Sequence, residues 1–281
     1  MDTGERDEKI CLLYQPKAFR SKMRLKAKFH KNPKAFKDNF TTQSKAYAAY
    51  RPLYPETLFR YLAGECREHK LAWDAGTGNG QSAQKLALYF DQVYATDASS
   101  TQILNAFPLE NISYAVANEQ APALKRRSVN LITVAQALHW FDTEVFYAEA
   151  ERVLKRYGVL ACWSYKLFRI NPDVDREVDC LYKDILGNYW DPERRLVDTG
   201  YRTLSFPFRE FRAPKIELIS TWDFENMLGF LSSWSAVTNY KKRKGSDPIA
   251  VILDRLKAVW GEPVEKKNVK WPLSIRVGRI R

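Results

Sequence analysis

The chain has 281 residues, of which 45% are hydrophobic and 14% aromatic, and its formal charge is +12 at pH 7. This length suits one large α/β domain, and a chain this apolar can bury a substantial core, which excludes global disorder. No apolar stretch approaches the roughly 20 residues that span a bilayer, and the four cysteines lack the spacing of metal ligands. We therefore expect reduced thiols and a cytoplasmic protein without a transmembrane segment.

Half of the excess positive charge lies near the N-terminus. Nine Lys or Arg and no acidic residue fall between Lys17 and Lys37, and residues 1–40 carry a net charge of +6. Such a tract is most often a solvated tail, and less often it contacts RNA or an anionic membrane surface. We predict a disordered basic extension over 1–37, followed by one folded domain over 38–281.

Helices and strands alternate in the first part of the predicted domain. A helix with an apolar face is predicted over 55–70. Further strands are predicted over 71–73, 93–96, 112–116, 129–135 and 159–163, and further helices over 81–90, 99–107 and 143–155. Asp142 or Thr143 can cap the last of these helices, and Lys155 and Arg156 suit its final turn. This alternation predicts a parallel sheet covered by helices on both faces.

The alternation stops after Tyr165. The segments predicted beyond it are mixed helix and loop over 166–213, a strand over 215–220, helices over 222–234 and 247–260, and a closing strand over 274–280. We interpret this half as the far edge of the sheet with a helical cap inserted over about 166–240, and not as an independent domain.

A glycine-rich turn, Asp74-Ala75-Gly76-Thr77-Gly78-Asn79-Gly80, lies between a predicted strand and a predicted helix. Glycines at alternate positions let the main chain turn sharply and approach a nucleotide-like cofactor at the carboxyl ends of the strands. The spacing GxGxG differs from the GxGxxG of dinucleotide sites. S-adenosylmethionine has no pyrophosphate, and Asp74 can attract its ammonium group directly or through water. The alternative is a tight turn that binds nothing.

Two further predicted strand ends carry acidic or amide side chains. Asp97 ends the second strand, where a carboxylate can accept the hydrogens of both ribose hydroxyls. The alternative is that Asp97 caps the helix that follows Ala98 and Ser99. Asn118 and Glu119 follow the third strand, where an amide can hydrogen-bond the adenine edge. Taken alone, this last pair would be an ordinary polar loop.

The segment Gln136-Ala-Leu-His139-Trp140-Phe141 follows the fourth strand. That strand lies beside the first in a doubly wound sheet, so His139 is expected near the reactive end of the cofactor. A histidine there could take a proton from a substrate hydroxyl or acid. The alternative is a histidine that packs and hydrogen-bonds locally, and the sequence favours neither. Trp140 and Phe141 are predicted pocket walls, where an aromatic face also attracts a sulfonium.

Together these residues resemble the class I S-adenosylmethionine-dependent methyltransferases, and within them the trans-aconitate methyltransferase-like group that acts on small molecules. The narrower matches are Tyr47-Ala-Ala-Tyr-Arg51-Pro-Leu-Tyr-Pro55, Ser233-Trp-Ser-Ala-Val237 and Arg276-Val-Gly-Arg279. The resemblance covers roughly residue 40 to the C-terminus. It implies an α/β Rossmann-like sheet of seven strands, with helices on both faces and the last strand antiparallel.

The chain departs from the pattern of this family at two places. Asn130 stands where the family usually has Asp, and Lys155-Arg156-Tyr157-Gly158 replaces the usual Lys-Pro-Gly-Gly turn. Neither departure touches the cofactor motifs. We therefore expect altered local stability and little loss of activity.

The resemblance implies S-adenosyl-L-methionine as the cofactor, without a metal. The residues predicted to bind the cofactor are Asp74, Gly76, Thr77, Gly78, Gly80, Asp97, Ala98, Asn118, Glu119, Gln136, Tyr47 and Arg51. The predicted catalytic residue is His139, and the residues predicted to line the substrate pocket are Trp140, Trp163, Tyr165 and Trp234.

The predicted function is methyl transfer to a small molecule, by O-methylation of a carboxylic acid or a phenol. A carboxylate needs no base at neutral pH because its pKa is about 4, whereas a phenol would benefit from a base such as His139. The alternatives are a methyltransferase acting on RNA or protein, a nicotinamide-dependent oxidoreductase, and a nucleic-acid-binding protein that uses the basic tract.

Overall fold

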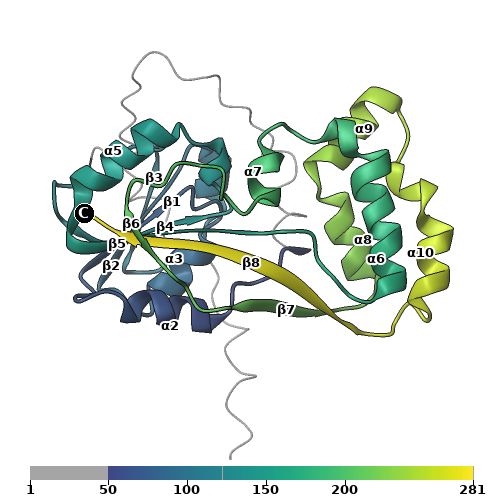
Figure 1. Ribbon diagram of the computed structural model, residues 1–281, viewed down its shortest axis with the longest axis horizontal. Coiled ribbons are helices and arrows are strands. Elements are labelled where there is room, and N and C mark those ends of the chain that lie inside the picture. Colours follow the sequence, from purple (N-terminus) through teal and green to yellow (C-terminus); the bar gives the residue numbers. More distant parts are fainter. Residues whose placement is uncertain (1–49, 122, 281) are drawn as a thin grey trace, which may run out of the picture. The chain divides into compact units, whose positions relative to one another are not determined.

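The fold is described from a computed structural model, which covers residues 50–121 and 123–280 (Figure 1). The predicted basic extension over 1–37 and the predicted cofactor ligand Tyr47 lie outside these residues. Within the residues covered, no helix has the length and apolar character needed to cross a bilayer.

Five parallel strands form the larger part of the sheet. They are β1 (Leu71–Ala75), β2 (Gln92–Asp97), β3 (Ile112–Val116), β4 (Val129–Ala135) and β5 (Leu154–Tyr165). Their order in the sheet is β3-β2-β1-β4-β5, with every neighbouring pair parallel. The order of the strands reverses between β1 and β4. In a doubly wound sheet, ligands bind at the carboxyl ends of the strands at such a point.

The strand β8 (Lys267–Arg279) runs antiparallel to the others, as predicted for the last strand. Its second half lies between β5 and β6 (Arg209–Phe211), and its first half pairs with β7 (Glu217–Trp222). The sheet therefore has eight strands, where seven were predicted. The strand predicted over 215–220 is β7, and β6 is the additional one, within the segment predicted as helix and loop over 166–213. Pairing with β7 also explains why β8 begins at Lys267 and not at residue 274.

Helices cover both faces of the sheet, as predicted. The helices of the first half are α2 (Glu56–Gly64), α3 (Gln81–Leu86), α4 (Ser100–Leu104) and α5 (Thr143–Val153). Side chains alternate between the two faces of a strand. In β5, Ala161 and Trp163 accordingly join the apolar cluster that contains α2 and α3, whereas Leu160 and Cys162 join the cluster that contains α5.

The predicted ends of four helices are wrong. The helices predicted over 55–70 and 143–155 end at Gly64 and Val153. Those predicted over 81–90 and 99–107 end at Leu86 and Leu104. Lys155 and Arg156 are not in a helical turn, because the chain enters β5 at Leu154, which already pairs with Val129 of β4. The predicted cap by Asp142 is confirmed, since its carboxylate accepts the N–H of Val145 at 3.3 Å.

Most of the chain between β5 and β8 is helical. The elements are α6 (Pro172–Asp179), the π-helical turn η2 (Cys180–Ile185), η3 (Gly187–Tyr189), α7 (Arg194–Asp198), α8 (Phe224–Ser232), α9 (Ser235–Lys244), η4 (Pro248–Val251) and α10 (Leu253–Trp260). Helices therefore continue beyond 240, and β6 and β7 separate α7 from α8. In Figure 1, α6, α8, α9 and α10 are gathered beside the start of β8.

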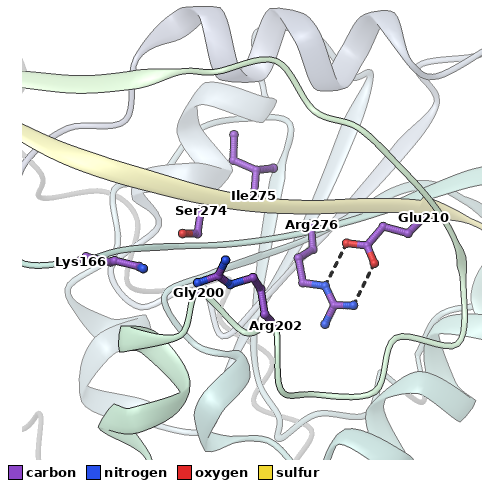
Figure 2. Close-up of a pocket in the computed structure, with 7 residues that line it drawn as sticks. All are labelled: Lys166, Gly200, Arg202, Glu210, Ser274, Ile275 and Arg276. Carbon is purple, nitrogen blue, oxygen red and sulfur yellow. Dashed lines mark hydrogen bonds and ion pairs between the residues drawn. The ribbon is translucent and has the colours of Figure 1, made fainter.

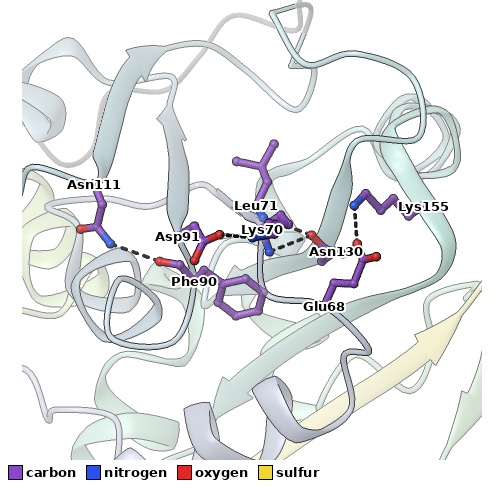
Figure 3. Close-up of polar contacts among 8 residues, drawn as sticks. All are labelled: Glu68, Lys70, Leu71, Phe90, Asp91, Asn111, Asn130 and Lys155. Atoms are coloured by element: carbon purple, nitrogen blue, oxygen red, sulfur yellow. Dashed lines mark hydrogen bonds and ion pairs between the residues drawn. The ribbon is translucent and has the colours of Figure 1, made fainter.

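A polar cluster joins the amino-terminal ends of β1 and β4 (Figure 3). The amide oxygen of Asn130 accepts the main-chain N–H groups of Lys70 at 3.2 Å and Leu71 at 3.1 Å. The ammonium group of Lys155 lies 2.6 Å from the Glu68 carboxylate, which also accepts the Asn130 amide N–H at 3.4 Å. Both departures from the family pattern thus lie at the edge of the sheet opposite the glycine-rich turn.

Candidate active site

The glycine-rich turn after β1 has a backbone that only glycine adopts without strain. Gly76, Gly78 and Gly80 have φ angles of +67°, +58° and +87°, in the left-handed region. A Cβ at Gly76 would lie 2.5 Å from the Cβ of Ala137, and one at Gly80 would collide with the hydroxyl of Tyr114. The turn therefore brings its main chain close to the segment after β4, as a cofactor cradle requires.

Asp74 lies beneath this turn and is fully buried. Its two carboxylate oxygens accept the hydroxyls of Thr77 at 2.5 Å and Thr133 at 2.6 Å. Burial raises the pKa of Asp74 to about 6, although the two hydroxyl hydrogen bonds act in the opposite direction. A carboxylate with no exposed surface does not reach a ligand directly. Asp74 thus positions Thr77 and ties the turn to β4.

Asp97 at the end of β2 is also hydrogen-bonded to the glycine-rich turn. Its Oδ2 atom accepts the N–H of Gly78 and its Oδ1 atom accepts the N–H of Ser99, each at 2.8 Å. The helix α4 is capped by the hydroxyl of Ser99, which accepts the N–H of Gln102 at 3.4 Å. The cap expected of Asp97 is therefore supplied by Ser99. Because a carboxylate can accept about four hydrogen bonds, the two main-chain bonds are compatible with a ribose contact.

The other residues predicted at the ribose and adenine follow neighbouring strand ends. Ala98 comes directly after β2, and Asn118 and Glu119 follow β3. Asp97 pairs with Val116 in the parallel register of β2 and β3, so both segments leave the same edge of the sheet. The exposed side chain of Asn118 has surface available for a ligand.

Gln136 directly follows β4 and has a left-handed backbone, with a φ of +54°. Its N–H donates to the carbonyl of Trp163 at 2.9 Å, and its amide nitrogen donates to the carbonyl of Tyr165 at 3.2 Å. A residue other than glycine keeps this conformation only where its surroundings impose it, and such residues gather at functional sites. Gln136 thus locks the end of β4 to the end of β5, beside the glycine-rich turn.

His139 follows on a short helical turn, η1 (Leu138–Trp140), and contacts Tyr201. The Nδ1 atom of His139 lies 3.0 Å from the Tyr201 hydroxyl. Burial, with the nearby charge of Arg194, lowers the pKa of His139 to about 3. This geometry favours the locally packed histidine over the catalytic base.

The residues predicted as pocket walls do not form one wall. Tyr165 accepts a hydrogen bond from Arg51 at 2.9 Å, and the Arg51 guanidinium lies 5.2 Å from the ring centre of Phe230 in α8. Trp140 is 37% exposed and packs against His139. The structure therefore brings Arg51 and Tyr165 together at the end of β5, and places Trp140 with the segment after β4.

The other two predicted walls are packed in apolar clusters. Trp163 is fully buried and meets Tyr54 and Phe59 edge-on, with ring centres 5.5 and 6.1 Å apart. Trp234 is 5% exposed and packs against Trp190 and Phe230. Core packing, the usual role of a buried tryptophan, accounts for both.

Three residues at this edge were missed by sequence reasoning. Thr133 holds Asp74, Tyr201 holds His139, and Arg194 lowers the pKa of His139. Thr133 carries a weak signal, because it and Asn130 are the two polar residues of the mostly apolar strand β4. Tyr201 and Arg194 carry none, since they come from the helical region after β5.

The chain matches one known domain family over part of its length and two known proteins over most of it. The methyltransferase domain family matches residues 73–162. A Dictyostelium discoideum protein named as a methyltransferase is 36% identical over 228 residues, which cover 80% of this chain and 87% of that protein. A Saccharomyces cerevisiae protein named as an S-adenosylmethionine-dependent methyltransferase is 25% identical, over 81% of this chain and 91% of its own length.

A solved structure from Anaeromyxobacter dehalogenans, named as a type II methyltransferase, is 43% identical with a TM-score of 0.78. The match covers 82% of this chain and 98% of that one. The order of the strands, the position of the glycine-rich turn and these relatives all indicate the same family. The chain belongs to the class I S-adenosylmethionine-dependent methyltransferases, and S-adenosylmethionine is its cofactor.

Proposed function

We propose that this methyltransferase transfers the methyl group to a carboxylate oxygen of a small organic acid. The observation that carries the proposal is the packing of His139, whose Nδ1 atom lies 3.0 Å from the Tyr201 hydroxyl and whose pKa is lowered to about 3 by burial. A base with so low a pKa accepts a proton from a phenol poorly at neutral pH. A carboxylic acid is already ionised there, because its pKa is about 4. Of the two acceptor classes that the sequence left open, the acid thus fits better.

The cofactor would lie across the glycine-rich turn, with its sugar at Asp97. The main chain of Gly76, Thr77, Gly78 and Gly80 would hold the amino-acid part, with Asp74 fixing the turn from below. Adenine would lie by Asn118 and Glu119, after Ala98. Gln136 would keep the end of β4 against this cradle. Bound S-adenosylmethionine supplies a methyl carbon attached to a positive sulfur.

Arg51 is the proposed partner of a negative group at the end of β5. Its guanidinium lies at the Tyr165 hydroxyl and against the ring of Phe230, and it suits either the substrate carboxylate or that of the cofactor. A carboxylate and a sulfonium lose charge as they react, so a site that excludes water favours the transition state, and alignment of the two adds to the rate. A cytoplasmic location and membership of the trans-aconitate methyltransferase-like group remain predictions.

The first experiment compares thermal unfolding with S-adenosylmethionine and with NAD. Because a ligand that binds only the folded state raises the melting temperature, S-adenosylmethionine is expected to stabilise the protein and NAD is not. The second experiment offers small acids, including trans-aconitate, and phenols together with isotopically labelled S-adenosylmethionine. Mass spectrometry should detect labelled methyl esters. Transfer to phenols alone, or to RNA or protein in the place of acids, would contradict the proposal.

A further inference from the structure

A polar pocket of about 480 Å³ lies beside the carboxyl end of β5, away from the glycine-rich turn (Figure 2). Lys166 directly follows β5, and Ser274 and Arg276 come from β8. Gly200 and Arg202, after α7, and Glu210 of β6 complete the wall. The glycine-rich turn follows β1, which β4 separates from β5 in the sheet. The pocket is therefore distinct from the cofactor cradle.

Two of the four charged residues in this pocket neutralise each other. Glu210 accepts from Arg276 at 3.0 Å on Nε and 2.9 Å on Nη2, as the dashed lines in Figure 2 show. The Nη1 atom of Arg276 donates to the carbonyls of Tyr201 and Leu204, both at 2.8 Å. Arg276 thus fastens the loop after α7 to β8, and its charge is already compensated.

The other two charged residues, Lys166 and Arg202, leave the pocket with an excess of two positive charges. Within the described part of the chain, neither side chain has a carboxylate partner. Arg202 uses only its Nε atom, which donates to the carbonyl of Thr199 at 3.0 Å. Arg202 is exposed and Lys166 half-buried, and an anion between these two cations would relieve their repulsion.

Gly200 allows the polar side chains to approach closely. Its φ is +62°, and a Cβ there would lie 2.5 Å from the Ser274 hydroxyl and 3.9 Å from the Cε atom of Lys166. A larger residue would push these two groups apart. Ser164 pairs with Ser274 across β5 and β8, and its fully buried hydroxyl has no hydrogen-bond partner among the described residues. A buried polar group therefore remains unsatisfied on β5 at this place.

We propose that this pocket binds a small oxyanion with two or more negative charges, through Lys166, Arg202 and the Ser274 hydroxyl. A phosphate group and a polycarboxylate share this chemistry. Arg202 lies next to Tyr201, whose hydroxyl contacts His139. The pocket therefore lies beside the residue that contacts the segment after β4.

The test measures binding of inorganic phosphate and of tricarballylate to the full chain by calorimetry, at constant ionic strength in chloride. At least one anion should bind saturably, and K166A/R202A should weaken binding at least tenfold. The matched control R126A/K257A also removes one Lys and one Arg, both exposed and outside the pocket, and should bind as the unchanged protein does. The affinity of S274A for the anion should lie between that of K166A/R202A and that of the control variant. The separate phosphate and tricarballylate titrations identify which source of the oxyanion is accepted.

Three outcomes would overturn the proposal. They are no saturable binding of either anion, equal loss in K166A/R202A and the control, and competition of the anion with S-adenosylmethionine. Affinity for S-adenosylmethionine is measured in the same samples and shows that the variants are folded. If the unchanged protein binds the anion but not S-adenosylmethionine, the proposed use of the cradle fails while the anion site stands.

Discussion

Gly76 lies where the main chain after β1 meets the segment after β4. We expect Gly76→Ala to weaken S-adenosylmethionine binding at least tenfold, because the new Cβ would lie 2.5 Å from Ala137 on a left-handed backbone. Gly64→Ala is the control, since a Cβ at this end of α2 meets no atom within 4 Å, and its effect on stability should stay within about 1 kcal/mol. Calorimetric titration measures the affinity of both variants for S-adenosylmethionine. Unchanged binding in a folded Gly76→Ala protein would contradict the proposed cradle.

The buried carboxylate of Asp74 makes a testable contribution to stability. Its pKa rises from 3.8 to about 6 on folding, so the folded protein keeps a proton that the unfolded chain releases between about pH 4 and 6. The free energy of unfolding therefore falls as the pH rises through this window, by up to about 3 kcal/mol. Asp74→Asn removes this titration.

The measurement is denaturant unfolding of Asp74→Asn and of the unchanged protein from pH 4 to 8. The difference in stability between the two should grow in favour of the variant up to about pH 6 and then stay level. A difference that stays flat for Asp74→Asn would show that this carboxylate ionises normally.

His139 should remain neutral throughout the physiological range. Because burial lowers its pKa to about 3, the C2 proton resonance of its ring should not titrate between pH 5 and 8, whereas an unperturbed histidine titrates near 6.5. Nuclear magnetic resonance follows this signal, assigned by its loss in His139→Gln. A titration midpoint between pH 6 and 7 would support His139 as a catalytic base and weaken the case for an acid substrate.

At the scale of the elements, Asn130 is expected to stabilise the start of β1 without affecting catalysis. Asn130→Ala leaves the N–H groups of Lys70 and Leu71 without their acceptor and should cost about 2 kcal/mol. Asn130→Asp keeps an acceptor oxygen and should cost less. Denaturant unfolding gives the stabilities, and S-adenosylmethionine affinity should be unchanged in both. A weaker affinity would mean that this edge of the sheet is coupled to the cradle.

The elements that sequence patterns predicted well are those whose signal is local. The strands β1 to β4 and the Asp142 cap follow from apolar runs and capping chemistry over a few neighbouring residues. The end of α5 and the first half of β8 were mispredicted, because Leu154 and Lys267 are strand residues only through pairing with distant segments.

The same distinction holds for the candidate site. Gly76, Gly78 and Asp97 were recognisable because their spacing reflects the backbone of one turn. The pairing of His139 with Tyr201 joins residues 62 positions apart, and the burial that sets a pKa depends on everything packed around the group. Local patterns carry neither kind of information.

At the scale of the whole described fold, β8 joins the sheet to the helical region. Trp271 of β8 is 1% exposed and packs against Tyr165, Phe168, Trp222 and Phe230. We expect Trp271→Ala to cost about 3–5 kcal/mol, as is typical for a buried Trp. Both regions should also unfold together, so that circular dichroism and loss of S-adenosylmethionine binding share one midpoint.

The control for this prediction is Val264→Ala, because Val264 is 83% exposed. This substitution should change the free energy of unfolding by no more than about 0.5 kcal/mol. Separate midpoints for the two signals in the unchanged protein would show that the helical region folds on its own.

The position of β8 between β5 and β6 also governs the order of events on the ribosome. β5 is complete at Tyr165, but its partner is complete only at Arg279. At normal rates of translation this gap lasts on the order of ten seconds. Throughout that time the nascent chain carries an apolar strand with one bare edge, the kind of surface that recruits other unfinished chains. This edge of β5 therefore stays open to aggregation until the final strand has emerged.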